Sequence, residues 1–259
     1  MRIFGKIVAL FPLVVGYLLT SVGTGLLPVK RRAKRALFIK NTSFFARLSL
    51  GLLGIRVLVK NRERLRRSGK GRLLVSNHLS YIDVPVIASI MPAVFITSVE
   101  LKNTMFIGLL AHYGGSLFVE RRSAAGLKRE IHGISRALHE GFSVVLFPEA
   151  TTSNGDTVRP FKNSLFNAAI ESTSDVLPVC LRYTKLDGEA MGHKNRDRIY
   201  YYGGMSFFTH LFRLLSHASV EVELVPLKAL KPRSGLTRKE LAALAHEAVC
   251  AAYHQGRVS

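Results

Sequence analysis

Hydrophobic and polar residues follow different patterns in the first quarter of the chain and in the rest. From Ile7 to Val29 no residue is charged, and about 20 apolar residues are enough for a helix to cross the hydrocarbon core of a bilayer. A second apolar stretch, Phe44 to Val59, has its large side chains near helical spacing and predicts an amphipathic helix at a membrane surface. Beyond Gly71, short apolar runs alternate with segments of helical period, which predicts an α/β domain.

The pattern beyond Gly71 also predicts individual elements. Strands are expected at Arg72–Ser76, Ser116–Glu120, Ser143–Phe147, Val176–Arg182 and Ser219–Val225. Helices are expected after Ser80 and at Leu127–Glu140, Phe161–Ser172 and Thr237–Tyr253. The last helix begins with Thr237 and Glu240 at the spacing of a capping box. We therefore expect two units, a membrane-anchoring helical element with a basic arm at residues 1–60 and an α/β domain at residues 61–259.

Positive charge is concentrated in the first quarter of the chain. Of the formal net charge of +20, residues 1–72 carry +16, from 17 Lys and Arg residues and one acid, and the remaining 187 residues carry +4. Nucleic acid and an anionic membrane surface are the two partners that suit such an arm. The residues between the charges are apolar, and no zinc-finger, RNP or KH pattern occurs, so we expect membrane lipids and no nucleic acid.

The first apolar segment is interrupted by helix breakers at Pro12, Gly16, Gly23 and Gly25. A single membrane span and a hairpin of two membrane-associated helices both fit this segment, and we favour the hairpin. Two ordinary core helices are the less favoured alternative. The basic cluster that follows Val29 predicts a location at the cytoplasmic face of the membrane. The two cysteines form no CxxC pair, which indicates a reducing compartment and no thiolate metal site.

One segment, Ser76–Asp83, places a histidine five residues before an aspartate, between a predicted strand and a predicted helix. His78 and Asp83 can pair if His78 lies in the turn and Asp83 in the first turn of the helix. A carboxylate bonded to one imidazole nitrogen fixes the tautomer and leaves the other nitrogen as a general base. The alternative is a plain helix cap formed by Ser80 and Asp83. Of the nine histidines, only His78 has an acid five residues further on.

Three further segments bring polar or special residues to predicted strand ends. Gly114–Arg122 ends in arginines, which suit a phosphate or are ordinary surface residues. Val145–Gly155 runs into a loop of hydroxyls that can hold a polar headgroup, or in which Glu149 only caps a helix. Val176–Val179 contains Pro178, which indicates an edge strand or a wall.

In this order and spacing, the four segments resemble the 1-acyl-glycerol-3-phosphate acyltransferase (lysophosphatidic acid acyltransferase) family of glycerolipid acyltransferases, over roughly residues 70–185. The resemblance implies a single mixed-sheet domain behind a two-helix membrane element. It implies that His78 and Asp83 are the catalytic pair and that Pro178 lines the acyl site. For the acceptor and its phosphate, the residues implied or placed on the same loop are Phe118, Arg121, Glu149, Thr151, Arg159 and Lys162.

The reaction implied is transfer of a fatty acyl group from acyl-CoA or acyl-carrier protein to a lysophospholipid hydroxyl, with no cofactor and no metal. The acceptor expected first is 1-acyl-glycerol-3-phosphate, which would give phosphatidic acid in phospholipid biosynthesis. His78 would take the hydroxyl proton, and backbone N–H groups near the start of the following helix, or another nearby donor, would meet the oxyanion. A non-catalytic lipid-binding protein of the membrane surface is the alternative outside enzymes.

The sequence departs from the family pattern at three positions. Ala150 stands where the family has Gly, Thr152 where members that use lysophosphatidate usually carry Arg, and Ser98 where Lys is frequent. Two cations for a free phosphate are therefore missing. Either nearby residues replace them, from the set Lys102, Arg122, Arg159 and Lys162, or the acceptor has a larger and less charged headgroup.

Overall fold

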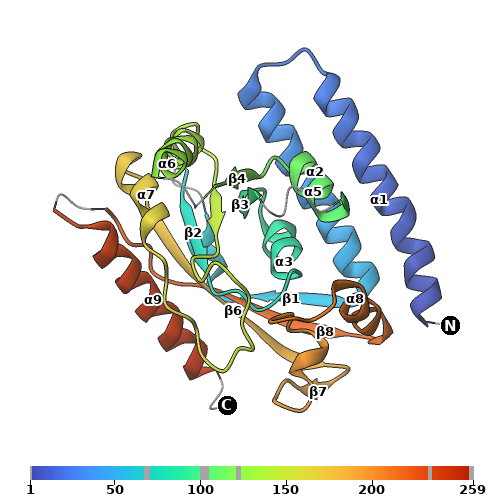
Figure 1. Cartoon of the computed structure of the whole chain (residues 1–259). Coiled ribbons are helices and arrows are strands. Elements are labelled where there is room, and N and C mark those ends of the chain that lie inside the picture. Colours follow the sequence, from blue (N-terminus) through green and yellow to red (C-terminus); the bar gives the residue numbers. More distant parts are fainter. Residues whose placement is uncertain (1, 67–70, 100–104, 121–123, 233–234, 257–259) are drawn as a thin grey trace.

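The computed structural model describes residues 2–66, 71–99, 105–120, 124–232 and 235–256 (Figure 1). Its helices are α1 (Arg2–Leu26), α2 (Arg31–Leu53), α3 (Asp83–Ile90), α5 (Met105–Tyr113), α6 (Ala124–His139), α7 (Asn167–Glu171), α8 (Phe207–Ser216) and α9 (Arg238–Gln255). Its strands are β1 (Ile55–Val59), β2 (Leu73–Ser76), β3 (Val94–Ser98), β4 (Leu117–Val119), β5 (Val144–Leu146), β6 (Val176–Leu186), β7 (Glu189–Ala190) and β8 (Val220–Pro226). Short 3-10 turns occur at η1 (Arg62–Leu65), η2 (Ser164–Phe166) and η3 (Arg196–Arg198).

The strands form one mixed sheet in the order β1-β8-β6-β2-β5-β3-β4, with β7 paired to β6. The run from β6 to β4 is parallel throughout. Strand β8 is antiparallel to β6 and parallel to β1. The predicted mixed-sheet α/β fold is confirmed. Because the parallel strands end at one edge of the sheet, the loops that follow β2, β5, β3 and β4 all leave from that edge, where ligands of open α/β sheets bind.

Alternate residues of the central strands enter two apolar cores, one on each face of the sheet. Leu73 and Val75 of β2 join the core that includes residues of α6 and α9, whereas Leu74 joins the core that includes residues of α2 and α3. Figure 1 shows helices on both faces accordingly. A parallel strand covered on both faces reads as a continuous apolar run, which is the pattern the sequence shows here.

Most predicted elements of the α/β domain form near their expected bounds, but one helix is shorter. The segment expected to be helical over Phe161–Ser172 forms only η2 and α7, beginning at Ser164. The Lys162 N–H donates to the Pro148 carbonyl at 2.9 Å, which ties residues before Ser164 to the preceding loop. The α9 capping box between Thr237 and Glu240 is confirmed.

The N-terminal helices pack side by side as a hairpin, as favoured from the sequence (Figure 1). The prediction of a helix over Phe44–Val59 is wrong beyond Leu53. Gly54 adopts a left-handed φ of 78° and closes α2, and a Cβ there would collide with the Ala218 carbonyl oxygen. The β-branched run that follows is strand β1, which completes the sheet beside β8. The boundary expected near residue 60, between the helical element and the α/β domain, remains a prediction. Strand β1 lies on the N-terminal side of that boundary.

The two hairpin helices have different surroundings. Helix α2 packs against α3 and so attaches the hairpin to the α/β domain. Helix α1 is long and apolar enough to cross a membrane by length and composition, yet only 6% of its most apolar window is buried within the protein. The hairpin therefore presents a large apolar surface that the protein itself does not cover.

Candidate active site

The predicted histidine–aspartate pair forms at the carboxyl end of β2. His78 lies in the loop after β2, and Asp83 is the first residue of α3. Their side chains meet with His78 Nδ1 2.8 Å from Asp83 Oδ2. A carboxylate only accepts hydrogen bonds, so Nδ1 carries the proton and the lone pair lies on Nε2. The His78 ring stacks on Phe147 at 4.0 Å between centroids, and its side chain is 18% exposed. The site thus holds an oriented imidazole that solvent or substrate can reach.

Asp83 is held by donors on both of its carboxylate oxygens. Besides His78, Oδ2 accepts from the backbone N–H groups of Leu79 at 2.7 Å and Ser80 at 3.0 Å. Oδ1 accepts from the Tyr183 hydroxyl at 2.6 Å. The side chain is fully buried, where a charged carboxylate is retained only if it is paired and hydrogen-bonded. The Leu79 and Ser80 N–H groups are occupied by Asp83, so they are not the oxyanion donors that the sequence led us to consider.

The simple helix cap considered for Ser80 and Asp83 does not account for this loop. Within the described part of the chain, the Ser80 hydroxyl is buried without a hydrogen-bond partner, and α3 has no side-chain cap. Asp83 instead organises the turn that contains His78.

Glu149 joins the histidine loop to the loop after β5. Its carboxylate accepts from the His78 N–H at 2.8 Å and from the Arg159 N–H at 3.1 Å. The Ser153 N–H donates to the His78 carbonyl at 3.0 Å, so the two loops are bonded in both directions. Burial raises the pKa of the Glu149 carboxyl to about 7, although both backbone hydrogen bonds act to lower it. One Glu149 oxygen therefore braces the backbone of His78 and the other holds the loop after β5, whatever contact with an acceptor the carboxyl makes.

The remaining predicted residues are distributed around the same sheet edge. Phe118 lies in β4 and pairs with Thr97 in the register of β3, whereas Arg121 lies outside the described residues. The side chains of Thr151, Arg159 and Lys162, on the loop after β5, are exposed. The hydrogen bonds of Glu149 and Ser153 tie the loop that carries these three residues to the histidine loop. The three residues stay predicted acceptor ligands.

Pro178 lies inside the sheet and not on an edge strand. Strand β6 runs unbroken through Pro178 between β8 and β2, and Pro178 pairs with Val75. The Leu227 N–H donates to the Pro178 carbonyl, so the backbone of Pro178 faces the side on which β8 has just ended at Pro226. The missing N–H of proline is tolerated there because β8 has no further strand residue that would accept a hydrogen bond from it. Its role as a wall of the acyl site stays a prediction.

Ala150 has a positive φ of 64° in the loop that follows β5. This left-handed conformation favours glycine, which is the residue that the resemblance leads one to expect at this position. The loop therefore keeps the backbone shape of the family pattern, although the residue differs.

Two residues that hold the site were missed by the sequence reasoning. Tyr183 comes from β6, and no local pattern links a strand tyrosine to an aspartate 100 residues earlier. Asn77, inside the histidine segment, bonds both backbone groups of Leu181, at 2.9 and 2.8 Å. Its position directly before His78 was the available signal, since a buried polar residue at a strand end needs partners.

Comparison with known proteins agrees with this fold. The model of the acyltransferase family matches residues 56–182. A lyso-ornithine lipid O-acyltransferase of Rhizobium meliloti (strain 1021) is 33% identical over 205 residues, which are 76% of this chain and 69% of that protein. A 1-acyl-sn-glycerol-3-phosphate acyltransferase of Neisseria gonorrhoeae is 32% identical over 157 residues, 59% of this chain and 58% of that protein.

A solved structure gives the same fold. The 1-acyl-sn-glycerophosphate (LPA) acyltransferase PlsC from Thermotoga maritima matches with a TM-score of 0.68 over 94% of this chain and 88% of that chain, at 21% identity. The chain therefore belongs to the acyltransferase family. It is an acyltransferase, and the resemblance inferred from its four segments is confirmed.

Proposed function

We propose that this protein is a membrane-bound O-acyltransferase that moves a fatty acyl group from acyl-CoA or acyl-carrier protein to the hydroxyl of a lysolipid. The observation that carries the proposal is the 2.8 Å bond between His78 Nδ1 and a fully buried Asp83. Such a pair is an oriented general base without a protein nucleophile, and it suits a substrate that brings its own hydroxyl.

The chemistry is a direct displacement. His78 Nε2 removes the proton of the acceptor hydroxyl while the oxygen attacks the thioester carbonyl, and Asp83 stabilises the imidazolium that forms. The tetrahedral intermediate collapses, the carbon–sulfur bond breaks, and the thiolate takes the proton from His78. General base catalysis of this kind contributes on the order of a hundred- to ten-thousand-fold. Positioning of the two substrates supplies a further part.

Two lysolipids are candidate acceptors. A 1-acyl-glycerol-3-phosphate needs cations for its phosphate, and Arg159 and Lys162 are the exposed cations on the bonded loop. A lysolipid with a larger headgroup, such as the lyso-ornithine lipid that names the Rhizobium relative, is favoured by the uncharged Ser98 and Thr152. The Rhizobium relative also aligns with more of this chain than the Neisseria relative does.

The exposed α1 supports attachment to a bilayer, and the charges that begin α2 support the cytoplasmic face. A lysolipid acceptor resides in that bilayer, so attachment brings the enzyme to its substrate. The donor, whether acyl-CoA or acyl-carrier protein, would approach from the aqueous side.

The test is acyl transfer by detergent-purified protein, with labelled acyl-CoA and labelled acyl-carrier protein, to a panel of lysolipids. We expect transfer to lyso-ornithine lipid, to 1-acyl-glycerol-3-phosphate or to both, and loss of transfer in His78→Ala. His132→Ala is the matched control, because His132 also contacts an acid, Glu171 at 3.2 Å, but lies on the surface. Absence of transfer with either donor to every acceptor would refute the proposal and favour a non-catalytic lipid-binding protein.

A further inference from the structure

An exposed apolar stripe follows one side of α1. Phe4 is 74% exposed, and the stripe continues at helical spacing through Val8, Phe11, Val15, Leu19, Val22 and Leu26. Exposed apolar surface of this extent marks a contact with a membrane or a partner. The end of α1 that carries Phe4 lies beside a second helix, α8, far away in sequence (Figure 1).

Helix α8 is amphipathic in a way that the α/β core does not require. Its inner side buries His210, Leu214 and Leu215, whereas Phe208 and Phe212, one turn apart, are 65% and 48% exposed. Two exposed phenylalanines beside a buried face are typical of a helix that lies in a membrane interface.

A cation ties α8 to the two hairpin helices. Lys6 of α1 donates through Nζ to the carbonyls of Leu53, at the end of α2, and His217, directly after α8, both at 2.7 Å. Phe4 lies two residues from Lys6 and so on nearly the opposite side of α1; Lys6 joins α8 to the same end of the helix that carries the apolar stripe.

A basic hollow adjoins α8. It has a volume of about 430 Å³ and is lined by Lys194, Asp197, Arg198, Arg213, Ser216 and His217. Within the described ranges, no carboxylate lies at ion-pair distance from Lys194, Arg198 or Arg213. The acid in its wall, Asp197, is engaged by the Tyr202 hydroxyl at 2.8 Å and by Arg196 at 3.8 Å. Three cations without an ion-pair partner among the described residues therefore line this hollow, and its acid, Asp197, is engaged by other side chains.

The wall of the hollow also contains a histidine with unmet hydrogen-bonding capacity. His217 Nδ1 bonds Asp187 at 2.8 Å, while its buried Nε2 has no partner among the described residues.

We propose that α8 and the hollow beside it form a second membrane contact, which binds the phosphate headgroup of an anionic phospholipid. Phe208 and Phe212 enter the acyl layer, and Lys194, Arg198 and Arg213 lie at the depth of the phosphates. The inference rests on the proposed membrane-bound function. Cations beside inserted aromatics match the layering of a bilayer, in which phosphates lie directly outside the acyl chains.

Helix α8 touches the catalytic loop directly through its side chains. The ring of Phe207 is 5.1 Å from that of Tyr81, a residue between His78 and Asp83, and the Tyr81 hydroxyl is 3.0 Å from His210 Nδ1. A membrane seated on α8 is therefore close to the loop that holds the base. The contact orients the strand-end site toward the bilayer that contains the acceptor.

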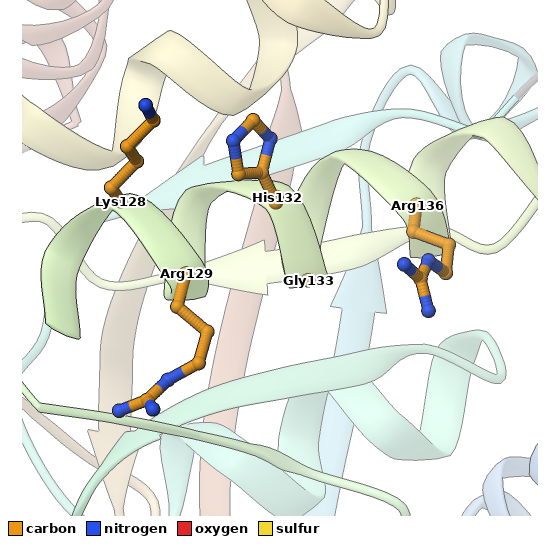
Figure 2. A pocket seen from close by; sticks show the side chains of 5 residues that line it. All are labelled: Lys128, Arg129, His132, Gly133 and Arg136. Atoms are coloured by element: carbon orange, nitrogen blue, oxygen red, sulfur yellow. The ribbon is translucent and has the colours of Figure 1, made fainter. Parts of the chain in front are cut away.

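A second basic hollow provides the comparison that the test needs. It has a volume of about 500 Å³ and is lined by Lys128, Arg129, His132, Gly133 and Arg136 of α6. Figure 2 shows Lys128 and His132 on one side of the helix and Arg129 and Arg136 on the other. No exposed large apolar side chain of α6 accompanies these cations among the described residues, so this surface lacks the apolar half of a membrane contact.

The first test uses the absence of tryptophan from the sequence. Phe208→Trp, Phe4→Trp and Leu244→Trp each introduce a single tryptophan, on α8, on α1 and on the exposed surface of α9. The proteins are mixed with vesicles of phosphatidylcholine and phosphatidylglycerol that carry brominated acyl chains. We expect quenching and a blue shift at positions 4 and 208, and neither at position 244. Quenching at 4 without quenching at 208 would overturn the α8 contact alone; quenching at neither would refute membrane binding itself.

The second test addresses the headgroup. In the Phe208→Trp protein, with vesicles of one fixed phosphatidylglycerol fraction, we expect Arg198→Gln/Arg213→Gln to raise the lipid concentration needed for half-maximal quenching, by roughly fivefold for each cation. Lys128→Gln/Arg129→Gln removes the same charge from α6 and should leave that concentration unchanged. Equal shifts in both double variants would mean that only net charge matters, and an unchanged concentration in the α8 variant would equally overturn the headgroup site.

Discussion

The catalytic loop and the N-terminal hairpin use burial in opposite ways. Asp83 has no exposed side-chain surface, and each of its oxygens has a donor. Phe4, at the other extreme, is 74% exposed with no partner side chain over it among the described residues. A buried polar group must find its partners inside the protein, whereas an exposed apolar group can find them in a bilayer. In the proposed function, Asp83 belongs to the residues that fix the chemistry and Phe4 to those that fix its location.

The largest effect should come from the base. His78→Ala removes the group that accepts the hydroxyl proton, so kcat should fall by about a thousandfold or more, while attachment to vesicles is unchanged. Acyl transfer and vesicle flotation measured on the same preparation check both halves. Turnover near that of the unaltered protein would remove His78 from the mechanism, and loss of flotation would show that the two regions are not separable.

A change in the exposed apolar stripe of α1 should impair membrane binding and leave catalysis intact. Phe11→Asp/Leu19→Asp places two charges on the exposed stripe, and each removes a burial worth about 1.5–3 kcal/mol for a large apolar side chain. Vesicle partitioning should fall by about a hundredfold or more, with turnover in detergent unchanged. Leu244→Asp, which alters an exposed leucine of α9, is the control and should leave partitioning as it was.

Glu149, which bonds the histidine loop to the loop after β5, should make the free energy of unfolding depend on pH. Burial raises the pKa of the Glu149 carboxyl to about 7 from an ordinary value near 4.5. The folded protein therefore holds this proton more tightly than the unfolded chain does. The contribution of Glu149 is fully present below about pH 4.5 and is lost as the pH rises through about 7, on the order of 2–3 kcal/mol. Urea unfolding between pH 5 and 8 measures it, and Glu149→Gln should lack this component of the pH dependence.

A smaller catalytic effect is expected at Tyr183. Tyr183→Phe removes the hydroxyl that donates to Asp83 Oδ1, so one carboxylate oxygen loses its donor and Asp83 orients His78 less firmly. We expect kcat to fall about tenfold with the acceptor KM unchanged, because Tyr183 acts through the base and not on the bound acceptor. Tyr253→Phe, which removes another buried hydroxyl bonded to the Gly155 carbonyl, is the control. An equal fall in Tyr253→Phe would mean that Tyr183 is only structural.

The smallest effect should be found at Ala150. Its φ of 64° costs about 1 kcal/mol for a residue with a Cβ, while glycine adds a comparable entropy to the unfolded chain. Ala150→Gly should therefore change the free energy of unfolding by less than about 1 kcal/mol. Ala218→Gly, at an exposed loop alanine with negative φ, should destabilise the protein instead. A larger loss at Ala150 than at Ala218 would contradict the strain argument.

How far the sequence could be interpreted depends on whether the signal is local. The pairing of His78 with Asp83 was predictable because five residues of loop fix it. Strand β1 was not, because Ile55–Val59 continues the apolar composition of α2 and only the conformation of Gly54 separates them. Tyr183 was not predictable either, because its partner is set by the neighbouring positions of β6 and β2 in the sheet. The bracing role of Glu149 was missed for the same reason.

The bonds of Lys6 to the ends of α2 and α8 have a consequence for kinetics. They join α1 to the catalytic body in a fixed orientation, so with the proposed attachment to a bilayer the enzyme would search for its acceptor by lateral diffusion in two dimensions. For an acceptor that resides in the same leaflet, the concentration that governs the rate is its mole fraction among the lipids. Diluting the lysolipid with inert lipid should then slow the reaction at constant bulk concentration, as surface dilution does for enzymes that remain on one surface through many turnovers.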